Sequence, residues 1–301
     1  MERKSITLML AVGASSVTMP ASATEGGGQM YAPGIENFMA GAMPPPGMYG
    51  IVYAYSYSAD KLRDNSGREI HNDFDLDVNV IAPRLIWVTN QHLLGGQLAW
   101  HVLVPFMDQR VSLSPAAGMH VSDHKFAQGD ITFGPAIGYH YSQHAHGLLA
   151  LDIFAPTGAY DVNDIANTGR NYWAVQPLYA FDYVNPDGLN FSAKVMYEFN
   201  AKNSDTHYKS GQEFIADVAV GWSVGQHWTL GVGGFVYRQT TDDKQYGQTI
   251  ADYKGRAYAL GPDVKYDSGK GWFVTGKYAP EFDVRNRPQG SVFTVKATFP
   301  L

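Results

Sequence analysis

Residues 291–301 read Ser-Val-Phe-Thr-Val-Lys-Ala-Thr-Phe-Pro-Leu, at the C-terminal end of the sequence. Every second residue from Phe293 to Leu301 is apolar, whereas Thr294, Lys296 and Thr298 stand between them. Such strict alternation predicts a β-strand with one apolar and one polar face. A transmembrane β-barrel needs a strand of this kind to close its sheet, because an open edge has no hydrogen-bond partners in lipid.

The same alternation recurs along most of the chain. We count twelve segments with this pattern, each of about ten residues, which is the length that crosses a membrane when the strand is tilted. They cover residues 48–60, 75–89, 95–107, 129–142, 147–156, 171–184, 188–199, 211–225, 227–239, 254–267, 271–283 and 290–301. The fold class predicted is therefore all-β, a single antiparallel transmembrane β-barrel of about twelve strands.

The connectors between these segments alternate in length. Those at 61–74, 108–128, 157–170, 200–210 and 240–253 are long and polar, whereas those at 90–94, 143–146, 185–187, 226 and 268–270 are short. This alternation is typical of outer-membrane barrels, with long external loops, short periplasmic turns and both termini on the periplasmic side. Trp87, Trp222, Trp228 and Trp272 lie near short turns, which predicts an aromatic girdle at the membrane interface. The alternative is a soluble barrel in which these aromatic residues form the core.

The N-terminal residues differ from the rest of the chain. Met1 to Lys4 carry positive charge, an apolar stretch follows at 6–17, and Ala21-Ser22-Ala23 offers a small-residue cleavage site, so 1–23 is predicted to be a secretory signal peptide. Residues 24–47 are rich in Pro and Gly and are predicted to form an irregular N-terminal arm. The predicted organisation is thus a signal peptide at 1–23, an arm at 24–47 and an outer-membrane β-barrel at 48–301.

The composition restricts the possible functions. The chain has no Cys, which excludes disulfides and thiolate metal sites, and its net charge of −6 argues against nucleic acid as a partner. No phosphate-binding loop or dinucleotide fingerprint occurs. His140, His144 and His146 lie close together in sequence, but without a nearby carboxylate they are expected to be solvent-facing. We therefore predict neither a metal nor a cofactor.

The polar parity of the strands supplies candidate residues for a substrate pathway through the lumen. The residues chosen on this basis are Asp77, Asn79, Gln97, His101, Asp152, Gln176, Asp182, Lys194, Glu198, Asp217, Lys265, Lys277 and Lys296. Because both signs of charge are present, these side chains either line a watery path or cross-brace a nearly closed barrel. Arg84 breaks the outward parity expected for Val78, Val80 and Ile86, so Pro83 before it predicts a bulge or a change of register.

Two further groups of residues are candidates for function. Aromatic residues in or beside the long loops, namely Tyr57, Phe126, Tyr160 and Trp173, are predicted to form an apolar rim where a solute enters. His140 and Ser142 share one face with the spacing found in some barrel phospholipases. Since they adjoin a short turn and Asp152 is too far away to orient the imidazole, an enzyme is not expected.

The arm has apolar side chains at Tyr31, Ile35, Phe38 and Met39, which do not favour free solution, and a stiff Pro44-Pro45-Pro46. It is too short to fill a twelve-strand lumen as a domain. We expect it to fold into or against the periplasmic mouth and to narrow it, the alternative being a disordered tail.

Several motifs together resemble the outer-membrane proteins named for the meta-pathway of phenol degradation, from about Met30 to the C-terminus. The matching residues are Gly41-Ala42-Met43-Pro44-Pro45-Pro46-Gly47, Leu94-Gly95-Gly96, Val104-Pro105, Gly129-Asp130, Pro156-Thr157-Gly158-Ala159-Tyr160, Asn171-Tyr172-Trp173, Ser210-Gly211 and Thr241-Asp242-Asp243. The resemblance implies a barrel in the bacterial outer membrane that lets small hydrophobic or aromatic compounds pass without an energy source. Its partners would be outer-membrane lipid, such a solute and the barrel assembly machinery. The alternatives are a structural or adhesive barrel without a pore and a barrel lipid hydrolase.

Overall fold

The computed structural model describes residues 24–301, so the predicted signal peptide, residues 1–23, lies outside the described residues. One 3-10 turn, η1 (Glu25–Gly27), precedes the strands. The strands are β1 (Gly47–Arg63), β2 (Glu69–Ile70), β3 (Asp75–Leu93), β4 (Gly96–Leu103), β5 (Phe106–Ala116), β6 (Met119–Gln128), β7 (Ile131–His140), β8 (Ala145–Ala155), β9 (Ala174–Val184), β10 (Leu189–Asn200), β11 (Tyr208–Lys209), β12 (Glu213–Val224), β13 (Trp228–Gln239), β14 (Asp243–Gln245), β15 (Gln248–Ile250), β16 (Arg256–Asp267), β17 (Phe273–Arg285) and β18 (Pro288–Pro300). Within residues 24–301 no helix is long and apolar enough to cross a membrane.

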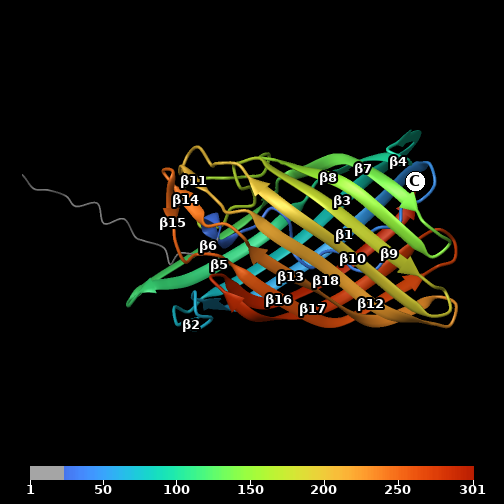
Figure 1. Ribbon diagram of the computed structural model, residues 1–301. Coiled ribbons are helices and arrows are strands. Elements are labelled where there is room, and N and C mark those ends of the chain that lie inside the picture. Colours follow the sequence, from blue (N-terminus) through green and yellow to red (C-terminus); the bar gives the residue numbers. More distant parts are fainter. Residues whose placement is uncertain (1–23) are drawn as a thin grey trace, which may run out of the picture.

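The sheet closes on itself through β1. This strand pairs with β18, from Tyr49 opposite Pro300 to Leu62 opposite Pro288, and its other edge pairs with β3. The described chain thus forms a closed antiparallel barrel with twelve strands in its wall (Figure 1). Closure by the C-terminal strand, expected from residues 291–301, is confirmed, and it leaves no unpaired edge between β1 and β18.

Two of the wall strands are interrupted. β4 and β5 both pair with β3 and are separated only by Val104 and Pro105, while β6 and β7 are separated by Gly129 and Asp130. The hairpin β5–β6 continues past the point where β7 pairs with β8 and projects from one end of the barrel (Figure 1). The expectation of a loop at 108–128 was therefore wrong, because alternation continues through these polar residues and sustains a ladder outside the membrane zone.

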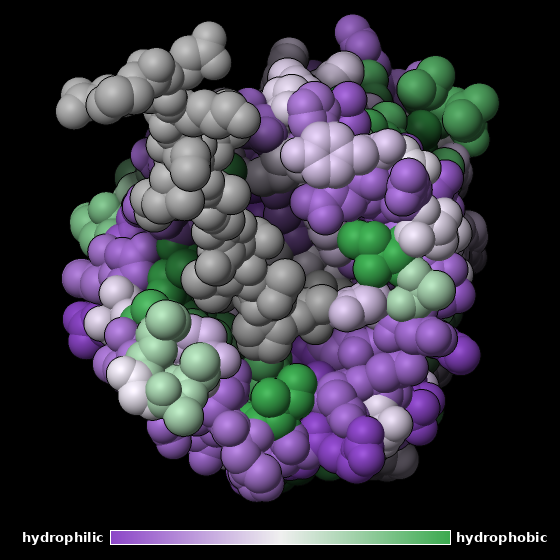
Figure 2. Space-filling view, turned by 90° about the vertical axis from the view of Figure 1, so that its left-hand side faces the viewer, coloured by the Kyte–Doolittle hydropathy of each residue, from purple (hydrophilic) through white to green (hydrophobic). Residues whose placement is uncertain are grey.

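The two ends of the barrel differ as expected. One end carries the short turns and Leu301, and the other carries the long connections, β2 and a small sheet of β11, β14 and β15 (Figure 1). The surface at the long-loop end is largely hydrophilic, with isolated hydrophobic patches (Figure 2). We call these the periplasmic and external ends, respectively, in keeping with the usual asymmetry of such barrels.

The outer surface of the wall is apolar. Large side chains exposed on it include Leu85, Trp100, Phe133, Leu149, Val175, Val195, Val220, Leu230, Val232, Leu260, Tyr278, Phe282 and Phe293. The tryptophans near the short turns point outward as well, and Trp222 is 59% exposed. This surface, with its aromatic girdle, belongs against lipid rather than in the core of a soluble barrel. The chain is a transmembrane β-barrel.

The arm lies inside the lumen. From Gly47 at the periplasmic end it runs the length of the barrel to Thr24, whose amide donates to Asp243 Oδ2 (3.1 Å) at the external end. The arm thus enters the barrel, as expected, but it extends beyond the periplasmic mouth, and the expectation that its N-terminal side lies on the periplasmic side was wrong. Because an extended chain covers about 3.3 Å per residue, this arm is long enough to thread a barrel it could not fill as a folded domain.

Candidate functional site

The arm is held in the middle of the lumen by charged side chains from the wall. Lys296 of β18 donates to Glu36 Oε2 (2.9 Å) and to the Phe38 carbonyl (2.9 Å), and both charged side chains are buried. Asp217 of β12 accepts hydrogen bonds from the Tyr31 hydroxyl (2.6 Å) and from the backbone N–H of Gly34 (2.8 Å). These lumen charges therefore bind the arm rather than stand free along an open pore.

Glycines on the inner wall make room for the apolar side chains of the arm. A Cβ at Gly221 of β12 would come within 2.8 Å of the Phe38 ring, and one at Gly138 of β7 within 2.6 Å of Met43. Within the arm itself, Gly34 adopts a φ of +84°, which allows the chain to turn after Pro33. The arm and the wall thus pack as one body in the periplasmic half.

Eleven of the predicted pathway residues point into the lumen. Ten are buried, namely His101, Asp152, Gln176, Asp182, Lys194, Glu198, Asp217, Lys265, Lys277 and Lys296. Gln97 is half-buried near the periplasmic end, where its Nε2 donates to the Thr89 carbonyl (3.2 Å). That they conduct a solute stays a prediction.

Asp77 and Asn79 were assigned to the wrong face. They lie opposite Ser58 and Ser56 of β1 on the outside, whereas Val78 and Val80 face the lumen with Tyr57 and Tyr55. The prediction placed apolar residues outside and polar residues inside. In this part of β3 the apolar residues face the lumen and the polar residues face outward. Arg84 has the same parity as Val78 and Val80 and faces inward without a bulge at this point, since β1 and β3 pair in continuous register.

The four predicted rim residues do not lie together. Tyr57 is buried inside the barrel and donates to Glu281 Oε2 (2.8 Å), while Phe126 and Trp173 are exposed on the outer surface. Tyr160 is in a loop, and its hydroxyl accepts from Asn203 Nδ2 (2.9 Å). Of these four, Tyr57 alone lines the cavity between the arm and strands β1, β3 and β5, so the apolar rim was wrong as a group.

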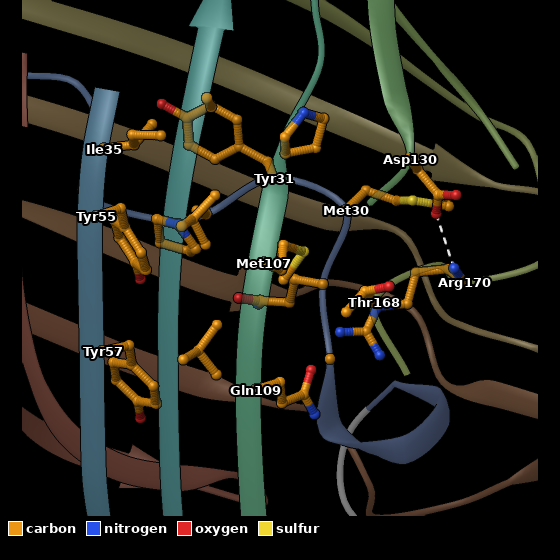
Figure 3. Close-up of a pocket in the computed structure, with 18 of the residues that line it drawn as sticks. Met30, Tyr31, Ile35, Tyr55, Tyr57, Met107, Gln109, Asp130, Thr168 and Arg170 are labelled. Carbon is orange, nitrogen blue, oxygen red and sulfur yellow. Dashed lines mark hydrogen bonds between the residues drawn. The ribbon is translucent and has the colours of Figure 1, made fainter. Parts of the chain in front are cut away.

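That cavity lies between the arm and the wall formed by β1, β3 and β5, in the external half of the barrel. Its volume is about 250 Å³. Tyr55 and Tyr57 of β1 and Met107 and Gln109 of β5 line it on either side of β3, and Met30 and Tyr31 of the arm border the same space (Figure 3). Leu76, Val78 and Val80 of β3 complete an apolar wall. Sequence parity missed most of this set because these strands carry their apolar side chains inward.

The floor of the cavity is polar. His101 of β4 lies 3.0 Å from Asp152 Oδ1 through its Nε2, and Lys194 Nζ lies 3.9 Å from Asp152 Oδ2 and 4.6 Å from the centre of the Tyr31 ring. Arg84 Nη1 is 3.8 Å from Glu36 Oε1. Among residues 24–301, neither Arg84 Nε nor His101 Nδ1 has a hydrogen-bond partner. The site therefore offers an apolar wall above a charge-balanced floor, with one unused donor at Arg84 Nε and one unpaired ring nitrogen at His101 Nδ1.

Loop residues border the external side of the cavity. Asp130, in the break between β6 and β7, accepts from the backbone N–H of Gly158 (2.9 Å) and of Arg170 (2.7 Å), the latter shown in Figure 3. Thr168 donates from its hydroxyl to the Gln128 carbonyl (2.9 Å). The connection at 157–170 is thereby fixed over the cavity.

The external end of the arm is held by a second group of loop residues. Glu25 accepts from Asn203 Nδ2 (3.1 and 3.0 Å) and from the Thr206 hydroxyl, and its backbone N–H donates to Ser210 Oγ (3.2 Å). Burial raises the pKa of the Glu25 carboxyl, and the hydrogen bonds from Thr206 and Asn203 oppose the rise. Asn203 is fully buried in this contact, although it belongs to a polar loop.

The residues weighed for catalysis form an ordinary turn. Ser142 Oγ accepts from the backbone N–H of His144 (3.2 Å) and of Ala145 (3.0 Å), while His140 Nδ1 lies 2.8 Å from His146 Nδ1. Over the described part of the chain, no three His, Asp or Glu side chains gather so as to hold a metal ion. The arrangement supplies neither an oriented base for Ser142 nor an evident metal centre.

The barrel is similar to the structures of several other proteins. A crystal structure of an outer-membrane channel from Pseudomonas putida F1 is similar, with a TM-score of 0.75 and 19% identity, over 87% of this chain and 98% of that one. A monoaromatic hydrocarbon channel, CymD, has a TM-score of 0.44 and 9% identity over 85% of this chain and 89% of that one. A Pseudomonas aeruginosa FadL homologue has a TM-score of 0.41 and 11% identity over 84% and 90%.

The first likeness supports the fold, and the other two are too distant to carry an argument. Comparison with curated protein sequences gives no match. The family model described as "Putative MetA-pathway of phenol degradation" matches residues 59–297, which is most of the chain. The protein therefore belongs to the family of the putative meta-pathway of phenol degradation.

Proposed function

We propose that this barrel is a channel of the bacterial outer membrane that lets small hydrophobic or aromatic compounds pass without an energy source. The observation that carries the proposal is the cavity of about 250 Å³ with its apolar wall of Tyr55, Tyr57, Val78 and Met107. Burying apolar surface is worth roughly 25 cal/mol for each Å² removed from water, so such a cavity concentrates apolar solutes. The family and the channel from Pseudomonas putida F1 support the same conclusion.

Passage beyond the cavity requires the arm to move. Below the cavity, Glu36 and Phe38 occupy the lumen and are held by Lys296. A solute bound in the cavity can reach the periplasm when these contacts open, so the arm would act as the gate.

The experiment fills the cavity from one strand of the wall. Val78→Trp places an indole in the cavity, whereas Asp77→Trp places the same side chain on the outside of β3. We expect Val78→Trp to lower the permeation of labelled toluene into proteoliposomes several-fold and Asp77→Trp to leave it unchanged. Equal permeation through both variants and the unaltered protein would argue against the cavity as the route.

A structural barrel without a pore is the second candidate, and the arm favours it because it occupies the lumen from Gly47 to Thr24. This candidate predicts no toluene permeation above that of protein-free liposomes. An enzymatic function has less support, since the similar crystal structure is a channel and Ser142 lies in a turn.

The partners follow from the surface. Outer-membrane lipid would cover the apolar band of the wall, and the barrel assembly machinery would insert the chain by reading its closing strand, β18. The strand ends on Phe299-Pro300-Leu301 rather than on an aromatic residue, although Leu301 keeps the apolar parity.

A further inference from the structure

Asp243 is a buried carboxylate that lacks a cation. It is 0% exposed, and it accepts from the Gly211 N–H (2.6 Å) and Gln239 Nε2 (2.6 Å) through Oδ1 and from the Tyr208 hydroxyl (2.5 Å) through Oδ2. Within residues 24–301, no Lys, Arg or His side chain lies within 4.0 Å of it. Buried charges in proteins are paired, because an isolated one loses its hydration without compensation.

The remaining donor to this carboxylate is the backbone nitrogen of Thr24, 3.1 Å from Oδ2. Thr24 is 2% exposed, and its hydroxyl donates to the Gly28 carbonyl (2.7 Å) while the Gly27 N–H donates to its own carbonyl (3.1 Å). The first described residue of the arm is thus fixed in place by its own turn, with its nitrogen directed at Asp243.

The sequence predicts that this nitrogen becomes the N-terminus of the mature chain. Ala21-Ser22-Ala23 is a small-residue cleavage site, and cutting after Ala23 turns the Thr24 amide into the α-ammonium of the mature chain. Hydrolysis adds one water across the Ala23–Thr24 bond, leaving a carboxylate on the released peptide and an ammonium on Thr24. The Thr24 α-ammonium would then be the cation that the buried Asp243 carboxylate lacks.

We propose that Asp243 is the binding site for the α-ammonium of the processed N-terminus, and that this ion pair fastens the external end of the arm. The site depends on the position of the cut, since a longer N-terminus would carry its charge away from Asp243 and leave the carboxylate unpaired. Processing and placement of the arm are thereby coupled. The inference does not depend on what the channel conducts.

The first measurement is the intact mass of the full-length protein produced with its own leader and purified from outer membranes. We expect a mature chain that begins at Thr24. A mature chain that begins at any other residue would overturn the proposal.

The second measurement is the rate at which an amine-reactive reagent labels the N-terminus near pH 7, where a free α-amine, with a pKa of about 7.7–8.0, reacts selectively. We expect labelling at least about tenfold slower than that of the urea-unfolded chain. Asp243→Asn should restore most of the free rate, whereas Asp242→Asn, which removes the neighbouring carboxylate paired with Lys254, should not. Labelling at the free rate in the unaltered protein, or no change in Asp243→Asn, would refute the ion pair.

A second variant tests the proposal even if Asp243→Asn does not fold. A mature chain with two glycines added before Thr24 keeps Asp243 and every loop contact, and it should label at close to the free rate. Protection of this extended N-terminus equal to that of the unaltered chain would also overturn the proposal.

Discussion

Glu36 attaches the arm to three strands of the wall. Its carboxylate meets Lys296 at 2.9 Å and the Tyr53 hydroxyl at 2.7 Å, with Arg84 at 3.8 Å. A single acidic residue in the arm is therefore surrounded by donors from β1, β3 and β18, on both sides of the closing seam. Removing one partner leaves the opposite charge buried, which is why such pairs are costly to break.

We expect Lys296→Met to destabilise the folded barrel by about 3–5 kcal/mol, because the Glu36 carboxylate loses its nearest cation and keeps the Tyr53 hydroxyl and the more distant Arg84. The double variant Glu36→Gln with Lys296→Met should be less destabilised than the sum of the two single variants, since neither charge is then left alone. Urea unfolding in detergent micelles measures both. Arg68→Met, which breaks the exposed pair with Asp64, should leave the midpoint of unfolding nearly unchanged.

At the same scale, Arg84 shows what the sequence could and could not provide. A charge in the middle of a strand is expensive on the lipid side, so Arg84 alone indicates that its parity faces inward. That inference would have placed Val78 and Val80 in the cavity and Asp77 and Asn79 outside. The alternation of apolar and polar residues predicted the opposite orientation for these four residues, because the lumen is apolar at that height and the outer face is not.

At the scale of elements, the β5–β6 hairpin is the main feature that connector length concealed. Its polar outer residues extend the barrel beyond the apolar band and touch the connection at 157–170. Asp123 accepts from the Ala166 N–H (2.9 Å), and Lys125 Nζ donates to Asp164 Oδ2 (2.5 Å). The strands of the wall were predictable because alternation persists for a full membrane crossing, whereas the short strands β2, β11, β14 and β15 are set by loop contacts.

We expect Asp123→Ala to speed hydrogen exchange of the amides at 160–170, because the hairpin then no longer holds that connection. The backbone N–H of Ala166, together with that of His124, lowers the pKa of the Asp123 carboxyl below its ordinary 3.8. A lowered pKa means that this contact contributes above pH 3.8 and is lost as the pH falls through the lowered value. Exchange protection should thus be constant from about pH 5 to 8. Asp75→Ala, on the exposed outer face of β3, is the control, and equal exchange in both variants would contradict the assignment.

For the whole molecule, the arm decides whether the barrel is open. The fold class, the strand number and the closing strand were all apparent from the sequence, and so was the affinity of the arm for a buried site. Its path was not, because no local pattern encodes which wall residues would receive Glu36, Phe38 and Thr24. Those contacts join residues more than 150 positions apart.

We expect deletion of residues 26–43 to raise the single-channel conductance of the purified barrel in a planar bilayer several-fold, because it removes the segment that fills the lumen. Deletion of residues 114–121, at the tip of the β5–β6 hairpin, shortens the chain without touching the arm and should leave conductance unchanged. An unaltered conductance on deleting 26–43 would mean that the arm does not limit the path.

The threaded arm also constrains the order of assembly. The pairing of β1 with β18 closes the barrel at a seam, and the arm leads directly into β1 at Gly47. Once the seam has closed, a segment with Tyr31 and Phe38 would have to pass lengthwise through the ring to reach the far opening. We therefore expect the arm to lie along the inner face of β12, β17 and β18 before the seam closes. Sealing the seam is then the step that traps it.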